Sequence, residues 1–251
     1  MASAVSARCW ASRASGLRGW TRLLPRHSHD AEPLLADQPA QALLRHERGL
    51  AVPFAETDKA DGQLTIYAAT KKATESMSHA YAHLWNLPTT MFRFFTVYGT
   101  WGRPDLAYFK FVDAILNDRP IDIYNHGDMW RDFTSVDDLV RGIRLLIDVP
   151  PVRPLPGEAI PEGDSLSPNA PWRVVNIGNS DKVRLLDFVE VIEDVLGRRA
   201  IRNYMPMQMG DVPATWADAG LLQRLTGYRP QTKLRDGMVK FVTWYREYYG
   251  K

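Results

Sequence analysis

A long helical pattern followed at once by a buried-strand pattern constrains this chain more than any other feature. Residues 64–85 carry apolar or aromatic side chains at mixed three- and four-residue spacing, which predicts one helix. Asn86 closes this helix and Pro88 is a stop signal. The run Thr89–Phe95 is mostly β-branched and aromatic, which is typical of a buried parallel strand. The succession predicts an α/β fold.

The remaining pattern extends this prediction to the C-terminus. The sequence predicts helices over 107–116, 136–147, 185–196, 218–225 and 234–249, and strands over 121–124 and 172–177. Ser135 and Asp218 are the predicted N-caps of two helices, and Asp137 and Asp138 favour the first turn of the former. The loop 97–105 follows a strand at its carboxyl end, where open α/β sheets bind ligands.

Composition limits the classes of function. The formal net charge of +2 indicates neither nucleic-acid nor membrane binding, and no apolar run approaches the roughly 18 residues that span a bilayer. Cys9 is the single cysteine, so an internal disulfide is excluded and a reducing compartment, the cytoplasm, is expected.

The first fifty residues differ from the rest. Residues 1–29 contain no Asp or Glu but five Arg, at positions 8, 13, 18, 22 and 26, as in a mitochondrial transit peptide. A truncated, rearranged or out-of-frame start is the favoured alternative. We therefore expect an atypical, disordered segment over 1–52, one domain over 53–251, and within it a loosely ordered proline-rich insertion over 150–171.

The helix 64–85 carries a chemically suggestive pair. Tyr67 and Lys71 are four residues apart and share one helix face. A lysine ammonium beside a phenol favours the phenolate, so Tyr67 can exchange a proton with a sugar hydroxyl. Taken alone, the same spacing also occurs in ordinary surface pairs.

Further motifs resolve this ambiguity by resemblance. From residue 53 onward the chain resembles NAD-dependent nucleotide-sugar epimerases of the extended short-chain dehydrogenase/reductase superfamily, and the UDP-glucuronate 4-epimerases most of all. The segments that carry the resemblance are Glu56–Asp58, Tyr67–Lys71, Phe94–Asp105, Gly127–Asp138, Asn176–Gly178 and Gly210–Asp218. The resemblance implies part of a doubly wound, Rossmann-like parallel sheet and a smaller C-terminal α/β portion that binds substrate.

The resemblance also implies roles for named residues. Tyr67 is the expected acid/base catalyst, and Lys71 its electrostatic partner and a ligand of the nicotinamide ribose, so both are expected to bind NAD. Thr96 and Arg103 are expected to hold the carboxylate of a UDP-hexuronate. The family usually has Pro where Thr100 stands, which bears on the rigidity of the loop.

Arg131 and Asp211 are the expected ligands of the UDP moiety. Arg131 would bind the diphosphate, and its ordinary alternative is a salt bridge with Asp132 or Asp137. Asp211 would help to hold the nucleotide, and an Asx turn before Pro213 is equally expected. His79 and His83 have a spacing compatible with zinc, but an ordinary helix surface is the favoured interpretation.

Two expected parts of the family are missing from the sequence. It has no Gly-x-x-Gly-x-x-Gly phosphate loop for NAD, and no Ser or Thr between Ser28 and Thr57, where the family has a Ser/Thr cluster. C4 epimerisation of a UDP-hexuronate is therefore the first prediction, with a UDP-sugar as partner and a homodimer compatible with it. A non-catalytic fragment that acts as an interaction module, or a related decarboxylase or dehydratase, remains open.

Overall fold

The computed structural model describes residues 53–63, 65–208 and 211–251. The predicted segment 1–52, with Cys9 and the Arg-rich start, lies outside the described residues. The helices are α1 (Ile66–Trp85), α2 (Ala107–Leu116), η4 (Tyr124–Gly127, a 3-10 turn), α3 (Val136–Ile147), α4 (Leu185–Leu196), α5 (Gly220–Thr226) and α6 (Leu234–Tyr249). The strands are β1 (Thr89–Phe94), β2 (Thr96–Tyr98), β3 (Pro120–Ile123), β4 (Trp130–Ser135), β5 (Trp172–Ile177), β6 (Lys182–Arg184), β7 (Ile201–Tyr204) and β8 (Ala214–Thr215).

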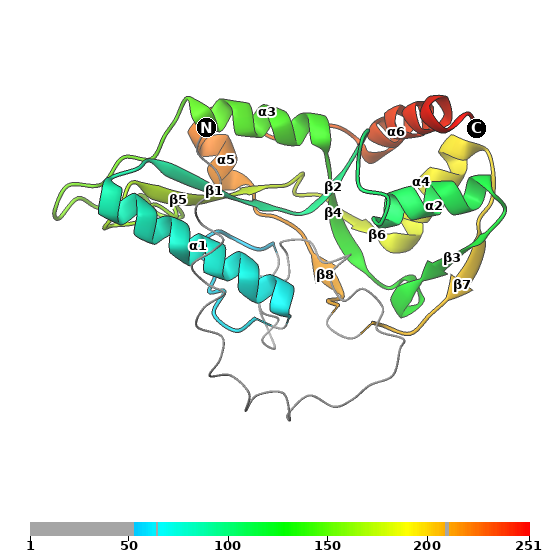
Figure 1. Cartoon of the computed structure of the whole chain (residues 1–251), viewed down its shortest axis with the longest axis horizontal. Coiled ribbons are helices and arrows are strands. Elements are labelled where there is room, and N and C mark those ends of the chain that lie inside the picture. The colour runs from blue at the N-terminus through cyan, green and yellow to red at the C-terminus, as the bar shows by residue number, and fades with distance from the viewer. Residues whose placement is uncertain (1–52, 64, 209–210) are drawn as a thin grey trace, which may run out of the picture. The chain divides into compact units, whose positions relative to one another are not determined.

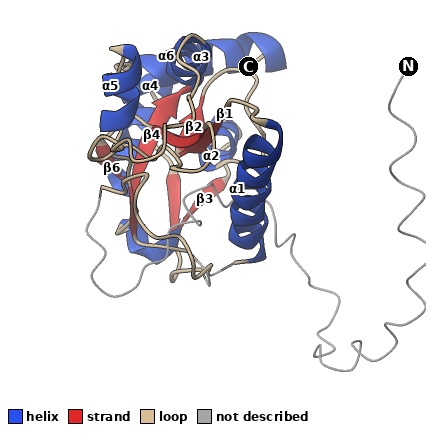
Figure 2. Cartoon of the chain, turned by 90° about the vertical axis from the view of Figure 1, so that its left-hand side faces the viewer, coloured by secondary structure: helices blue, strands red, loops and turns tan. Residues whose placement is uncertain are grey.

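Parallel pairing dominates, as the α/β prediction requires. β1 pairs with β5 from Thr89 opposite Trp172 to Phe94 opposite Ile177. β4 is central to a second sheet, in which β2 and β8 are parallel neighbours and β6 is an antiparallel one. β3 and β7 form a separate parallel pair. Figure 1 shows the β1–β5 pair between α1 and the two helices α3 and α5, and Figure 2 shows α1 on the opposite side of the strands from α5.

Two apolar clusters fill the space between these layers. The larger one joins α2, α4 and α6 with residues of β3 and β4, and its members include Phe109, Phe133, Phe188 and Phe241. The smaller one joins α3, α5 and β5. None of the helices that the structure describes is both long and apolar enough to cross a membrane.

Several predicted boundaries are confirmed because local signals set them. The helices α2, α3, α4 and α6 begin and end as predicted, and α1 ends at Trp85 with Asn86 in the left-handed conformation (φ 51°). β5 also has its predicted bounds, and residues 150–171 contain neither helix nor strand.

Other predictions are wrong at their edges. The strand predicted over Thr89–Phe95 is two strands, because the chain leaves the β1–β5 pair at Phe95 and β2 then pairs with β4. The strand predicted over 121–124 begins and ends one residue earlier. Ser135 precedes α3, but its side chain makes no capping hydrogen bond.

The helix predicted from Asp218 begins only at Gly220. The backbone N–H of Asp218 donates to the carbonyl of Phe54 (2.9 Å), and its side chain accepts from the N–H of Gly220 (2.8 Å). Asp218 is therefore held in an isolated parallel bridge between Phe54 and Ala217 rather than at the helix start.

A buried carboxylate joins β4 to two distant segments. Asp132 has no exposed surface. Its Oδ1 accepts from the N–H of Asn179 (2.9 Å) and the hydroxyl of Thr134 (3.1 Å), and its Oδ2 accepts from the N–H groups of Ser180 (2.9 Å) and Ala217 (3.2 Å). Burial raises the pKa of Asp132 because it penalises the charged form, while these donors oppose the shift. One side chain therefore fixes the turn after β5 and the residues after β8.

We expect Asp132→Ala to lower the free energy of unfolding by about 2 to 3 kcal/mol, since it leaves the backbone N–H groups of Ser180 and Ala217 without their acceptor, while that of Asn179 keeps the Thr134 hydroxyl (3.2 Å). Urea unfolding followed by circular dichroism measures this loss. Asp137→Ala is the matched control: Asp137 pairs with Lys240 at 3.2 Å on the surface, and its loss should cost less than about 1 kcal/mol. Equal effects of the two variants would contradict the role given to Asp132.

Candidate functional site

Tyr67 and Lys71 lie on one face near the N-terminus of α1. The helix begins there because the hydroxyl of Thr65 accepts from the N–H of Ala68 at 3.1 Å. Lys71 Nζ lies 5.3 Å from the centroid of the Tyr67 ring. Tyr67 is half-buried and Lys71 is exposed. The geometry predicted from their spacing is present, and their catalytic role stays a prediction.

A buried ion pair fixes α1 on the sheet. Arg93 of β1 donates from Nε to Glu75 Oε1 (2.8 Å) and from Nη2 to Glu75 Oε2 (3.0 Å), and both residues are buried. Burial alone would raise the pKa of Glu75, but the bonds from Arg93 outweigh it and the pKa is lowered. The bidentate pair sets the position of the helix that carries Tyr67.

The segment before α1 is held by a second buried carboxyl. Glu56 Oε1 accepts from the backbone N–H of Asn176 (2.8 Å), and Arg93 Nη1 donates to the carbonyl of Glu56 (3.4 Å). The side-chain amide of Asn176 donates to the carbonyls of Phe54 (2.9 Å) and Asp218 (3.1 Å). Burial raises the pKa of Glu56 to about 7, because no ion pair compensates its desolvation as fully as Arg93 compensates that of Glu75.

The loop after β2 takes its course from two close approaches. Gly99 has φ 148°, a conformation that favours glycine, and a Cβ there would overlap Val136. A Cβ at Gly102 would overlap the hydroxyl of Tyr108 on α2. Trp101, with φ 60°, places its ring 5.2 Å from those of both Trp244 and Tyr248 on α6. Contacts with α2, α3 and α6 therefore hold this loop.

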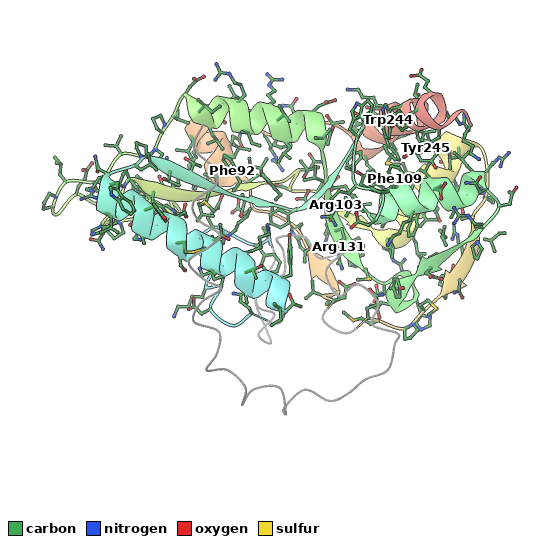
Figure 3. All side chains as sticks on the ribbon, in the orientation of Figure 1. Phe92, Arg103, Phe109, Arg131, Trp244 and Tyr245 are labelled. Atoms are coloured by element: carbon green, nitrogen blue, oxygen red, sulfur yellow. The ribbon has the colours of Figure 1, made fainter. Side chains whose placement is uncertain are left out.

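The predicted carboxylate ligands are divided between β2 and this loop. Thr96 is the first residue of β2, opposite Phe133 of β4, and not a loop residue as expected. Arg103 lies on the loop and forms an ion pair with Asp105, in which Nε donates to Oδ1 at 3.0 Å and Nη2 contacts Oδ2. Figure 3 labels Arg103 beside β2 and Arg131 on β4, strands that pair with each other.

Arg131 and Asp211 are brought together. Arg131 Nη2 donates to Asp211 Oδ1 at 2.7 Å, although the residues are 80 positions apart. The side chains are 16% and 29% exposed. Burial lowers the pKa of Arg131, which Asp211 opposes. The salt bridge considered with Asp132 or Asp137 is wrong, because Asp132 Oδ1 and Oδ2 accept from other donors and Asp137 pairs with Lys240. Asp211 Oδ1 also accepts from the N–H of the next residue, Val212 (2.8 Å), which is not an Asx turn, because that turn needs the N–H two residues on and Pro213 has none.

His79 and His83 bind the proline-rich connection. His79 Nε2 lies 2.7 Å from the Ser167 hydroxyl and His83 Nδ1 lies 2.7 Å from the Asn169 carbonyl. Within the described ranges, no three His, Cys, Asp or Glu side chains form a group that could hold a metal ion. Residues 150–171, predicted to be loosely ordered, are therefore held against α1 at Ser167 and Asn169.

The chain is similar to known proteins of one family. Residues 47–155 match the profile of the "NAD dependent epimerase/dehydratase family". A probable UDP-glucuronate 4-epimerase of Rhizobium meliloti is 56% identical over 201 residues, which are 79% of this chain and 58% of that protein. The chain carries a domain of the NAD-dependent epimerase/dehydratase family. Protein CapI of Staphylococcus aureus is 53% identical over 199 residues, and this alignment covers 79% of this chain and 59% of the length of CapI.

Solved structures agree with this family. The UDP-glucuronic acid 4-epimerase of Bacillus cereus, in complex with UDP-glucuronic acid and NAD, matches this chain with a TM-score of 0.69 at 27% identity. The match covers 85% of this chain and 61% of the Bacillus cereus chain. MoeE5, in complex with the same two ligands, has a TM-score of 0.68 at 28% identity and covers 84% of this chain and 64% of its own. The chain thus spans about three fifths of the length of these epimerase/dehydratase relatives.

The described residues fit the cofactor of the family only in part. Tyr67 and Lys71, the residues predicted to bind the nicotinamide ribose, lie side by side. A pyrophosphate needs backbone amides at a glycine-rich helix start, and no helix in 53–63, 65–208 or 211–251 begins at such a loop. The N-terminus of α1 is already capped by Thr65.

The residues that position the candidate site were not singled out from the sequence. Arg93 is the one charged residue in the run Thr89–Phe95, and that contrast is a signal of a buried ion pair. Asp132 stands among other polar residues of β4, where no such contrast marks it. A cavity of about 320 Å³ lies beside Ser180, Trp216 and Arg229, but none of the predicted site residues lines it. The cavity therefore does not mark the predicted chemistry.

The two buried glutamates should respond oppositely to pH. Glu56 has a raised folded-state pKa of about 7, so the folded state prefers its protonated form. The free energy of unfolding should then fall by up to about 3 kcal/mol as pH rises from 4.5 through 7. Glu56→Gln should remove this loss. Compared with the unchanged chain, the variant should therefore gain more stability at pH 8 than at pH 5, as measured by urea unfolding at both pH values.

Glu75→Gln is the contrasting variant for that measurement. The lowered pKa of Glu75 gives stability that is present above pH 4.5 and lost as pH falls through its folded-state pKa. The substitution should destabilise the chain at pH 8, because it leaves buried Arg93 without its counter-ion. A loss of stability for Glu56→Gln at pH 8 would contradict the assignment.

Proposed function

We propose that this chain supplies the substrate-binding side and the acid/base pair of an NAD-dependent 4-epimerase that acts on a UDP-hexuronate, interconverting UDP-glucuronate and UDP-galacturonate. The observation that carries the proposal is the Tyr67–Lys71 geometry in a chain whose relative at 56% identity is named a probable UDP-glucuronate 4-epimerase. A UDP-sugar is then its small-molecule partner.

Proton transfer is the chemistry that this chain contributes. Tyr67 would take the proton of the C4 hydroxyl as a general base and return it as a general acid. The ammonium of Lys71, four residues along the same helix face and 5.3 Å from the centre of the Tyr67 ring, would be the charged neighbour of the phenol in this step. Bound NAD supplies the hydride acceptor and donor at C4. The Arg93–Glu75 pair would keep Tyr67 in register by fixing α1.

Charged groups would hold the two ends of the substrate. Arg131 would bind the diphosphate, and its pairing with Asp211 supports this role because it orients a half-buried guanidinium. Thr96 and Arg103 would hold the hexuronate carboxylate from β2 and the loop after it.

We also propose a homodimer located in the cytoplasm. Support for the homodimer comes from α1, which leaves Met77, Tyr81 and Leu84 each more than half exposed. The single cysteine in the whole sequence is consistent with a reducing compartment.

The UDP site is tested first. We expect the full chain to bind UDP in isothermal calorimetry, and Arg131→Ala to weaken this binding about 10- to 100-fold, since a charge-assisted phosphate contact is lost. Arg131→Lys should restore it only in part, because an ammonium cannot bind in a bidentate manner. Arg144→Ala, which removes an exposed pair with Asp148, is the control and should bind UDP as the unchanged chain does.

The catalytic pair is tested in a hybrid. The nucleotide-binding half of the Bacillus cereus epimerase, joined at Pro53, should give a protein that interconverts UDP-glucuronate and UDP-galacturonate. Tyr67→Phe should lower kcat by roughly two or more orders of magnitude, because the general acid/base is lost. Tyr81→Phe, on the exposed face of the same helix, should leave kcat unchanged. An active hybrid that tolerates Tyr67→Phe would show that another group is the base.

A further inference from the structure

The expected ligand of the substrate carboxylate already holds a carboxylate. Arg103 and Asp105 make a two-point contact, with Nε donating to Oδ1 at 3.0 Å and Nη2 to Oδ2. The pair is accessible, since the side chains are 60% and 30% exposed. The pairing lowers the pKa of Asp105, the bond from Arg103 being the main cause, so Asp105 is an anion at neutral pH.

The loop that carries both residues is fixed at several points. Gly99 and Gly102 approach Val136 and Tyr108 closely, and Trp101 contacts two rings of α6. The N–H of Leu106 also donates to the carbonyl of Arg103 at 3.3 Å. Because Asp105 is two residues from Arg103 on a held loop, its carboxylate stays within reach of the guanidinium at a high effective concentration.

We propose that Asp105 competes with the substrate carboxylate for Arg103 and thereby sets how strongly the site prefers a UDP-hexuronate over a neutral UDP-hexose. This inference rests on the proposed function, in which Arg103 binds that carboxylate. The two competitors are the same chemical group and seek the same two-point geometry. A uronate must displace Asp105 or share the guanidinium with it, whereas a neutral hexose leaves the pair intact.

The size of the effect follows from the exposure of the pair. Exposed ion pairs stabilise by up to about 1 kcal/mol, so displacing Asp105 should weaken uronate binding by about two- to five-fold. The opposite role of a paired carboxylate is to orient the guanidinium, and removal of Asp105 would then weaken uronate binding. The two roles therefore predict changes of opposite sign.

Calorimetric titration of the full chain with UDP-glucuronate and with UDP-glucose tests the inference. Asp105→Asn and Asp105→Ala should each bind UDP-glucuronate about two- to five-fold more tightly than the unchanged chain and bind UDP-glucose equally well. In an Arg103→Ala background the same substitutions should have no effect on either ligand, which completes a double-mutant cycle. Asp148→Asn, which removes the same charge from an exposed pair with Arg144, should change neither affinity.

Three results would overturn the inference. Weaker binding of UDP-glucuronate by both Asp105 variants, with unchanged melting temperatures, would mean that Asp105 orients Arg103. An equal gain for both sugars, or a gain that persists without Arg103, would mean a general charge effect. Failure of the unchanged chain to bind either UDP-sugar would overturn the proposed function itself. Titration of the unchanged chain therefore separates a failure of the proposed function from a failure of the inference about Asp105.

Discussion

The buried carboxylate of Asp132 is the interaction on which the arrangement of the central strands depends. An ionised carboxylate loses a large hydration energy when it is buried, and only several donors together can offset that loss. Asp132 obtains them from its own strand, from the turn after β5 and from the residue after β8. The next residue, Arg131, meets Asp211. β4 therefore carries both Asp132, which holds the neighbouring segments, and Arg131, the candidate phosphate ligand.

Buried and exposed charges have different partners in this chain. Glu75 and Arg93 are almost fully buried, and each keeps a two-point partner, because an unpaired charge there would be prohibitively unstable. Arg103 pairs with Asp105 near the surface, where water can replace either partner at little cost. Fixed pairs suit the positioning of a helix or strand, and exchangeable pairs suit a group that must accept a ligand. The candidate site has both kinds, on neighbouring segments.

The matched structures of the epimerase/dehydratase family indicate which ligands these ion pairs would meet. The matched structures contain UDP-glucuronic acid and NAD, and this chain corresponds to about three fifths of their length. The described residues include those proposed for proton transfer, diphosphate binding and carboxylate binding, while no described helix begins at a glycine-rich loop.

The sequence by itself determined the helices and the chemistry of single residues. Helix ends depend on neighbours within a few positions, so Asn86 and Gly197 were sufficient to place the ends of α1 and α4, whereas α1 begins at Ile66, two residues later than predicted. The shared face of Tyr67 and Lys71 follows from the helical repeat alone. The Arg103–Asp105 pair was also within reach of local reasoning, since only one residue separates them.

Tertiary structure decided the short strands and the long-range pairs. β2, β6 and β8 have two or three residues each, too few to show any periodicity, and they exist as strands because β4 lies beside them. Asp218 fits a helix cap by its local sequence, but the bridge to Phe54 takes it out of the helix. Arg131 and Asp211 meet because β4 and β8 are adjacent, not because of anything between them in the chain. Contacts of this kind depend on how elements pack, and packing is a property of the whole chain rather than of any window within it.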